Sequence, residues 1–196
     1  MFGDPESDAF GNLQSLSECC SVNPKKPSGM KDSFLCSFIP MTAVGEHGEL
    51  NSSEIKTYQQ VKKGFSGFIE NDVLFAKITP CMQNGKGAIA RGLKNGVGFG
   101  STEFHVLRPN PTQCDSIWLY TLLSFPSFRI NAEKNMSGSA GQRRVPASYL
   151  RNYKVKIPPL SLQQEFADFV HQVDKLKFDL GICLFVLKEE FFRLIG

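Results

Sequence analysis

The chain has 196 residues, enough for one large domain or for a domain with an appendage, and it can bury a substantial hydrophobic core. Its residues are 41% hydrophobic and 21% charged, with 17 Gly, 11 Pro and a net charge of +3, which excludes a disordered chain, a collagen helix and a pure coiled coil. No apolar run approaches the roughly 20 residues of a membrane span, and the N-terminus lacks the features of a secretion signal, so we expect a cytoplasmic protein with no membrane partner.

Strands dominate the predicted elements of the first half of the chain. Residues 1–33 are polar and rich in turn formers, so we expect little regular structure there. Apolar and alternating runs predict strands at 34–44, 72–78, 87–91 and 99–107, the last of them broken by Gly100-Ser101. Because Asn84-Gly85 favours a tight turn, the second and third of these strands are predicted to form a hairpin with its tip at 79–86.

Helical periodicity appears in the second half. Helices are predicted at 116–125, where Asp115 can cap the first turn, and at 128–135. Residues 137–141 are predicted to be a loop, and 153–157 to be a half-exposed strand. Strands and helices mix without a βαβ rhythm, so we expect an α+β fold with a mixed or antiparallel sheet over residues 1–157.

Residues 158–196 carry the pattern of a long C-terminal coiled-coil helix. Pro158-Pro159 ends the preceding strand, and Ser161 to Gln164 fits a capping box. At ~1.5 Å per residue the helix is about 50 Å long. Its own domain cannot bury an apolar stripe of that length, so we expect the helix to pair with another chain. The alternative is that its first turns dock on the same domain. The apolar residues recur in steps of three and four at Leu162, Phe166, Phe169, Val173, Leu176, Leu180, Cys183, Leu187, Phe191 and Leu194.

Positive charge is concentrated in the middle of the chain. Residues 1–60 carry a net charge of −4, residues 61–157 carry +9, and residues 158–196 carry −2. A modest excess of charge is often only a solvated surface, but this concentration makes binding to a nucleic acid or another polyanion an equally strong interpretation.

Cysteine and histidine spacing argues against a metal site. There is no C-x-x-C motif, and His47, His105 and His171 are not grouped with cysteines at zinc-ligand spacings. Free, mostly buried thiols are therefore favoured over disulfides, as in a reducing compartment. The six cysteines are Cys19, Cys20, Cys36, Cys81, Cys114 and Cys183.

Motifs for catalysis are weak. The glycine-rich stretch 96–100 leads into a strand and not into the helix that a nucleotide-binding loop requires. Asp72, Glu103 and Lys77 come nearest to a metal-dependent nuclease set, but the favoured interpretation is that Asp72 closes a turn and Glu103 is a hydrogen-bond partner. No nucleophile stands in the context of a catalytic triad, so we expect a non-catalytic protein.

Polar loop residues of the basic segment are the candidate DNA contacts. Arginine matches the guanine edge, Asn and Gln match the adenine edge, and lysines and hydroxyls suit phosphates. Each residue alone could be a turn former or a solvated loop residue, and for Gln142 and Arg143 a role in orienting the domain is weighed equally. The candidates are Lys77, Thr79, Gln83, Asn84, Lys86, Ser101, Thr102, Gln142, Arg143 and Arg144.

Four blocks of this sequence together resemble the specificity subunit of type I restriction-modification systems. The resemblance runs from about residue 34 to 180, and the blocks occur in the order of that family. They are KITPCM at 77–82 with NGKG at 84–87, GSTEF at 100–104 with LRP at 107–109, GSAGQRRVPASYL at 138–150, and IPPL at 157–160 with QQEF at 163–166.

The resemblance implies that residues 1–157 form a target-recognition domain that reads half of a split double-stranded DNA sequence. Residues 158–196 would form a conserved spacer helix that pairs antiparallel with a counterpart. A methyltransferase (modification) subunit and a restriction subunit are then the partner chains, and S-adenosylmethionine, ATP and Mg²⁺ belong to them, so this chain is expected to hold no cofactor.

A complete member of the family has two recognition domains and two long helices, whereas this sequence has one of each and resembles a half-subunit or a fragment. We expect the helix to pair as a homodimer or with another specificity half. The two-fold symmetry of a homodimer would make the recognised sequence palindromic with a spacer. Two other functions stay open: an interaction scaffold that assembles with modification subunits without binding DNA, and a stand-alone nuclease.

Overall fold

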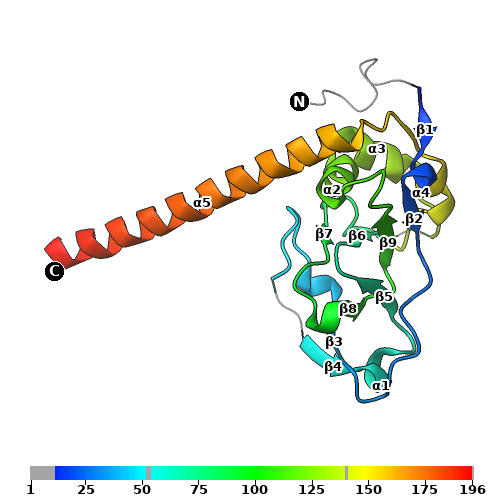
Figure 1. The fold of residues 1–196 in the computed structure, drawn as a ribbon, viewed down its shortest axis with the longest axis horizontal. Coiled ribbons are helices and arrows are strands. Elements are labelled where there is room, and N and C mark those ends of the chain that lie inside the picture. The colour runs from blue at the N-terminus through cyan, green and yellow to red at the C-terminus, as the bar shows by residue number, and fades with distance from the viewer. Residues whose placement is uncertain (1–11, 52–53, 140, 196) are drawn as a thin grey trace.

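Two four-stranded sheets form the body of the chain, and one long helix runs away from it (Figure 1). This computed structural model describes residues 12–51, 54–139 and 141–195, with side chains up to residue 177. One sheet has the order β2-β9-β6-β7 and is antiparallel; the other has the order β4-β3-β8-β5, with its β3–β8 pair parallel. The strands are β1 (Gln14–Ser15), β2 (Cys20–Val22), β3 (Leu35–Ile39), β4 (Glu54–Thr57), β5 (Ser66–Ile69), β6 (Val73–Ala76), β7 (Gly87–Ile89), β8 (Val97–Gly100), β9 (Phe104–Pro109) and β10 (Lys154–Val155).

Helices cover the antiparallel sheet and connect the two sheets. The α-helices are α1 (Tyr58–Val61), α2 (Ser116–Ser124), α3 (Pro126–Lys134), α4 (Ala147–Asn152) and α5 (Leu160–Ile195), and the 3-10 helices are η1 (Leu16–Glu18), η2 (Met41–Ala43) and η3 (Lys94–Gly96). As predicted, Asp115 caps α2: its carboxylate accepts from the backbone N–H groups of Ile117, at 2.7 Å, and Trp118. No helix among the described residues is both long enough and apolar enough to cross a bilayer.

The core is layered because β6 is buried on both faces. Val73 and Phe75 point to the cluster that contains α2 and α3, whereas Leu74 points to the cluster between the two sheets. A third cluster, with Phe38 and Phe99, lies against α1 on the outer side of the second sheet. The chain therefore stacks helices, sheet, sheet and a short helix, and the mixed α+β prediction is confirmed.

The predicted hairpin is confirmed, and the predicted break after residue 99 divides the fourth strand between two sheets. β6 and β7 pair in the register Val73↔Ile89, with 79–86 at the tip. The predicted strand at 99–107 is two strands in different sheets, because the turn at 101–103 interrupts it: Phe104 N–H donates to Ser101 O and Glu103 N–H donates to Ser101 Oγ. A hydroxyl that bonds nearby backbone favours such a turn over a continuous ladder.

Other elements departed from the sequence patterns. Residues 1–33 were expected to have little regular structure, and they hold only the short elements β1, η1 and β2, because β1 pairs with β10 and β2 pairs with β9 across the chain. The predicted strand at 34–44 ends at Ile39, since Pro40 begins a 3-10 turn. Four short elements, α1, α4, β4 and β5, were not predicted. The five cysteines with described side chains are free thiols, as expected, and Cys183 lies outside the described side chains.

The long helix is attached to the body through one buried amide. Gln163 is 0% exposed; its Oε1 accepts from Asp115 N–H at 2.9 Å, and its Nε2 donates to Gln113 O at 3.0 Å and Pro158 O at 2.8 Å. The predicted capping box at Ser161 is wrong, because α5 begins at Leu160. The N–H groups of residues 162 and 163 instead donate to Pro159 O.

The described part of α5 docks on α2 mainly through residues outside the predicted seam, and the seam residues Leu162, Phe166 and Val173 are half-buried. Gln163 and Ala167 are buried on the side that faces α2. In contrast, two seam residues, Phe169 and Leu176, remain 55% and 67% exposed. The alternative that the first turns dock on their own domain is therefore realised, while the seam stays uncovered at these positions. The seam residues Leu180, Cys183, Leu187, Phe191 and Leu194 lie outside the described side chains.

A second buried polar residue ties three segments together. His105 is 4% exposed; its Nε2 donates to Val145 O at 2.8 Å and its Nδ1 accepts from the Asn23 amide at 2.9 Å, the arrangement of a neutral imidazole. Asn23 Oδ1 in turn accepts from Val106 N–H. Burial lowers the pKa of His105, with nearby Lys77 contributing, so the folded state favours the neutral ring.

We expect Gln163→Leu to lower the free energy of unfolding by about 3 kcal/mol, because it leaves one buried N–H and two buried carbonyls without partners. Urea unfolding followed by circular dichroism measures the change. The exposed neighbour supplies the control, and Gln164→Leu should alter stability by less than about 0.5 kcal/mol. A loss below about 1 kcal/mol for the Gln163 variant would show that the amide does not hold the helix.

The free energy of unfolding should fall as pH drops below about 6.5, because the unfolded imidazole takes up a proton that the folded His105 binds more weakly. His105→Gln should flatten this dependence between about pH 7.5 and 5.5, and the exposed His171→Gln should keep the parent slope. Urea titrations across this range test the expectation, which fails if both variants retain the parent slope.

Candidate nucleic-acid interface

Three segments that are distant in sequence meet around Glu103. The N–H of Lys77, at the end of β6, donates to Glu103 O at 2.9 Å, and Val145 N–H donates to Lys77 O at 2.9 Å. The loop before Val145 thus runs along the hairpin and forms a bridge between Ile78 and Arg144. We call this meeting point the Glu103 junction; it comprises residues 77–79, 101–103 and 142–144.

The two charges at the centre of the junction pair in a fork. Arg144 Nε and Nη2 each donate to a Glu103 carboxylate oxygen at 2.9 Å, and Arg144 Nη1 donates to Gln142 O at 3.1 Å. The guanidinium lowers the pKa of Glu103, and the carboxylate raises the pKa of Arg144. Because the Arg144 side chain stays 40% exposed, its charge is partly neutralised yet still accessible from solvent.

Several predicted contact residues have structural partners inside the molecule. Thr79 Oγ1 donates to Arg143 O and accepts from Arg143 N–H, both at 3.0 Å, and Arg143 Nη2 donates to the carbonyls of Glu133 and Met136. Lys86 Nζ donates to Val44 O at 2.9 Å. These bonds fix the loop backbones, in line with the architectural role weighed for Arg143.

Other predicted contact residues keep their polar groups at the surface. Among the described residues, no side-chain hydrogen bond or ion pair holds Lys77, Asn84, Thr102 or Gln142, and the last three are exposed. The Ser101 hydroxyl accepts from Glu103 N–H. The structure brings Lys77, Ser101, Thr102 and Gln142 to the Glu103 junction.

The remaining predicted residues lie along the far part of the hairpin tip. Gln83 Nε2 donates to Glu133 Oε1 at 3.2 Å, and Lys86 reaches the segment around Val44. Asn84 and Gly85 lie there too: a Cβ at Gly85 would meet Glu46 O at 3.0 Å, and its φ of +85° suits glycine. The predicted set therefore divides into a group at the junction and a group at the outer tip.

Arg129 supports the hairpin tip by hydrogen bonds to its backbone, and this residue was not identified from the sequence. Its Nη1 donates to Met82 O at 2.9 Å, its Nη2 donates to Gly85 O at 3.0 Å, and the guanidinium lies 4.7 Å from the centre of the Phe75 ring. Burial lowers its pKa to about 10, so the side chain stays charged at neutral pH. The one signal in the sequence was that an arginine lies within the predicted helix at 128–135, beside Phe128.

The acids that came nearest to a nuclease set have other roles. Asp72 is 1% exposed and accepts a fork from Arg108, at 2.8 Å from Nε and 2.7 Å from Nη2, and it also accepts from Ile69 N–H. Glu103 pairs with Arg144. The interpretation of Asp72 as a turn former and Glu103 as a hydrogen-bond partner is confirmed. No group of three His, Cys, Asp or Glu in the described ranges is placed to hold a metal ion.

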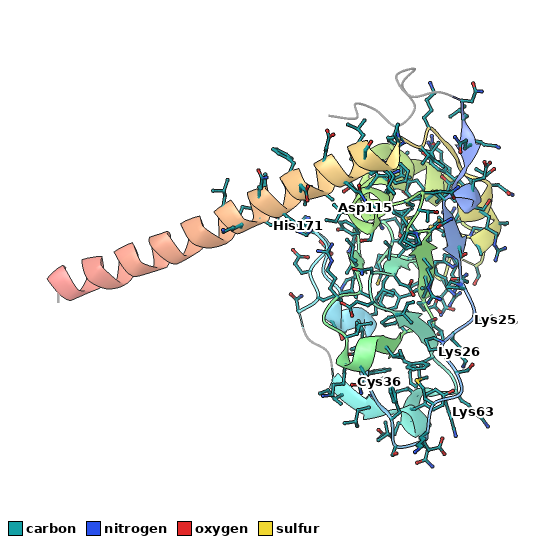
Figure 2. The ribbon with its side chains drawn as sticks, viewed as in Figure 1. Lys25, Lys26, Cys36, Lys63, Asp115 and His171 are labelled. Atoms are coloured by element: carbon teal, nitrogen blue, oxygen red, sulfur yellow. The ribbon has the colours of Figure 1, made fainter. Side chains whose placement is uncertain are left out.

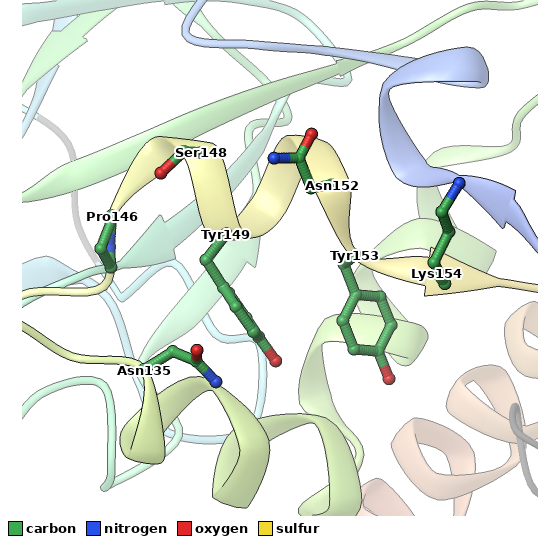
Figure 3. A pocket seen from close by; sticks show the side chains of 7 residues that line it. All are labelled: Asn135, Pro146, Ser148, Tyr149, Asn152, Tyr153 and Lys154. Atoms are coloured by element: carbon green, nitrogen blue, oxygen red, sulfur yellow. The ribbon is translucent and has the colours of Figure 1, made fainter.

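An open pocket of about 480 Å³ lies beside the loop that follows the junction (Figure 3). Tyr149 and Tyr153, with ring centres 5.8 Å apart, line it together with Asn135 at the end of α3 and Lys154 in β10. The pocket is therefore lined both by aromatic rings and by polar amide and ammonium groups. Sequence reasoning did not find it, because the α4 segment that shapes it was not predicted.

Solved structures of similar fold come from type I restriction-modification proteins. The HsdS subunit of Thermoanaerobacter tengcongensis superposes with a TM-score of 0.65 over 91% of this chain and 46% of that one, at 19% identity. A chain from a structure on complex assembly and conformational transition of the type I R-M system gives a TM-score of 0.64 over 85% and 43%, at 20% identity. These likenesses establish a common fold.

Sequence comparison shows the family. The chain is 39% identical to the EcoEI type I restriction enzyme specificity subunit of Escherichia coli over 83% of its length, and 40% identical to the EcoAI subunit of the same organism over 76%. It spans only about a quarter of each of these relatives, 27% and 25%. Residues 19–181 match the model of the type I restriction modification DNA specificity domain. The chain therefore belongs to the family of type I restriction-modification DNA specificity domains.

Proposed function

We propose that this chain recognises a specific sequence in double-stranded DNA and directs a partner methyltransferase subunit, and through the complex a restriction subunit, to that site. The match of residues 19–181 to the specificity domain carries the proposal. The chain would act in the cytoplasm without catalytic activity, and S-adenosylmethionine, ATP and Mg²⁺ would be held by the partner subunits.

The Glu103 junction is the proposed centre of DNA contact. Gln142 and Thr102 are exposed there, and an amide can pair with an adenine edge while a hydroxyl suits a phosphate or a base. Lys77 and Arg144 would contact phosphates or guanine. Glu103 would limit non-specific attraction by neutralising part of the Arg144 charge, because a carboxylate repels phosphates.

The outer tip and the buried bonds would support this reading surface. Asn84 is exposed at the tip and is a further candidate contact. Thr79, Gln83, Lys86 and Arg143 would act chiefly by fixing loop backbones, as their bonds to carbonyls and to Glu133 favour. Contact residues on loops that a rigid interior positions are the usual arrangement of a recognition domain.

We further propose that residues 1–157 form the recognition domain and that residues 158–196 pair with a second copy or with another specificity half. The exposure of Phe169 and Leu176, beside a docked stripe at Gln163 and Ala167, supports a second partner for the helix. Two-fold pairing would place two recognition domains at a set distance and make the target palindromic with a spacer.

Sequencing of methylated sites in cells that express the chain with its cognate modification subunit should reveal a single split motif. Thr102→Ala with Gln142→Ala should reduce methylation at that motif at least tenfold, because each lost base contact costs about 1 to 3 kcal/mol. Gln172→Ala, on the exposed side of α5, is the control. Stable assembly with the modification subunit but no DNA binding and no methylated motif would instead favour the interaction scaffold, and metal-dependent cleavage by the chain alone would favour the nuclease.

Phe169→Glu with Leu176→Glu should raise the dissociation constant of the helix-mediated dimer at least 100-fold, since burying each of these side chains contributes about 2 kcal/mol per chain. Sedimentation equilibrium of the full chain measures the change. Gln172→Glu adds charge to the same turns outside the seam and should leave the dimer intact. A parent chain that is monomeric at high concentration, or a double variant that stays dimeric, would contradict the pairing.

A further inference from the structure

Three lysines that the sequence divides between an acidic and a basic segment lie together on the body. Lys26 Nζ donates to the carbonyl of Lys62 at 2.6 Å, which ties the segment after β2 to the end of α1. Lys25, Lys26 and Lys63 are exposed and lie along one edge of the body, on the side away from α5 (Figure 2). We call these three residues the lysine corner.

The charges of the lysine corner are not neutralised within the described residues. Asp32, an acidic residue close to the end of α1, forms an ion pair with Lys62 at 2.7 Å and not with these three lysines. No ion pair in the described ranges uses Lys25, Lys26 or Lys63, so three positive charges face solvent side by side. Such a cluster repels itself unless counterions or a polyanion cover it.

The segments that carry the lysine corner contact the strands on either side of the turn at 101–103 in the Glu103 junction. Gly67 in β5 lies so close to the lysine segment that a Cβ there would meet Lys26 Cβ at 2.7 Å. In the same strand, Ser66 pairs with Gly100, the residue directly before the turn at 101–103. From the other end of the lysine segment, Asn23 bonds to His105, two residues after Glu103.

We infer that the lysine corner grips the DNA backbone next to the bases that the Glu103 junction reads, an inference that rests on the proposed DNA recognition. Lysines present flexible point charges that neutralise phosphates irrespective of sequence, as a backbone grip requires. An acidic protein partner would suit the same charges, but the adjacency to the junction favours the polyanion that the junction is proposed to read. The corner supplies affinity and register, and the junction supplies specificity.

Salt dependence tests the inference. A fluorescein-labelled mixed-sequence duplex of about 40 base pairs is titrated with the full chain, alone and with its cognate modification subunit, at several KCl concentrations. Changing Lys25, Lys26 and Lys63 to Gln should reduce the slope of log Kobs against log[KCl] by about 2.7, since each phosphate contact contributes about 0.9. Affinity at low salt should fall at least tenfold.

A matched variant controls for net charge. Arg91, Lys94 and Lys175 are exposed and lie elsewhere: residue 94 precedes the end of β8 that pairs with Ile69, opposite the Ser66 end, and residue 175 is on α5. Changing these three to Gln should leave the slope within about 0.5 of the parent value. Lys25→Gln with Lys63→Gln spares the Lys26 bond to the Lys62 carbonyl and should still lower the slope by about 1.8.

The outcomes separate the inference from the proposed function. If the parent binds duplex DNA and the lysine-corner variants keep its slope, the inference is overturned while DNA recognition stands. If those variants keep the duplex slope but lose binding to polyglutamate, the corner serves an acidic protein and the inference is likewise overturned. If neither the chain nor its complex with the modification subunit binds duplex DNA, both proposals fall.

Discussion

The buried amide of Gln163 determines how the long helix leaves the body. Its three hydrogen bonds join the first turn of α5 to Pro158, to Gln113 and to Asp115, the residue that caps α2. An amide with no exposed surface has few alternative partners, so the direction of α5 follows from the position of α2. A helix can fix the distance between two paired domains only if its first turn is held rigidly on its own domain. The hydrogen bonds of Gln163 would hold α5 in this way in the proposed pairing.

Supporting residues and exposed residues are separate at the Glu103 junction and along the hairpin tip. Arg143, Arg129 and Lys86 donate to backbone carbonyls and so position the loops without dictating which side chains those loops display. Thr102 and Gln142 lie exposed on that support. A recognition surface built in this way can exchange exposed residues while the buried bonds stay, which separates the stability of the domain from the choice of its target.

Local patterns made part of this structure predictable. The hairpin at 72–78 and 87–91 and the cap at Asp115 rest on interactions between near neighbours, and both were found from the sequence. The pairing of β1 with β10 joins residues about 140 positions apart, and no local pattern encodes it. The break in the strand at 99–107 was visible at Gly100-Ser101, but the assignment of its two parts to different sheets depends on pairing with distant strands. Among the candidate contact residues, the division into those bonded inside the molecule and those exposed was not predictable, because it depends on bonds between segments that are distant in sequence.

Charge counted along the chain differs from charge presented in space. The segment 61–157 carries +9, yet Arg108 is paired with Asp72, Arg144 with Glu103, and Arg129 is buried under the hairpin. Two of these cations are therefore at least partly neutralised and the third is buried, so the surface of this segment carries less free charge than the count suggests. In contrast, residues 1–60 carry a net negative charge, yet their Lys25 and Lys26 are exposed and lie beside Lys63. The exposed cations of the folded chain therefore come from both segments.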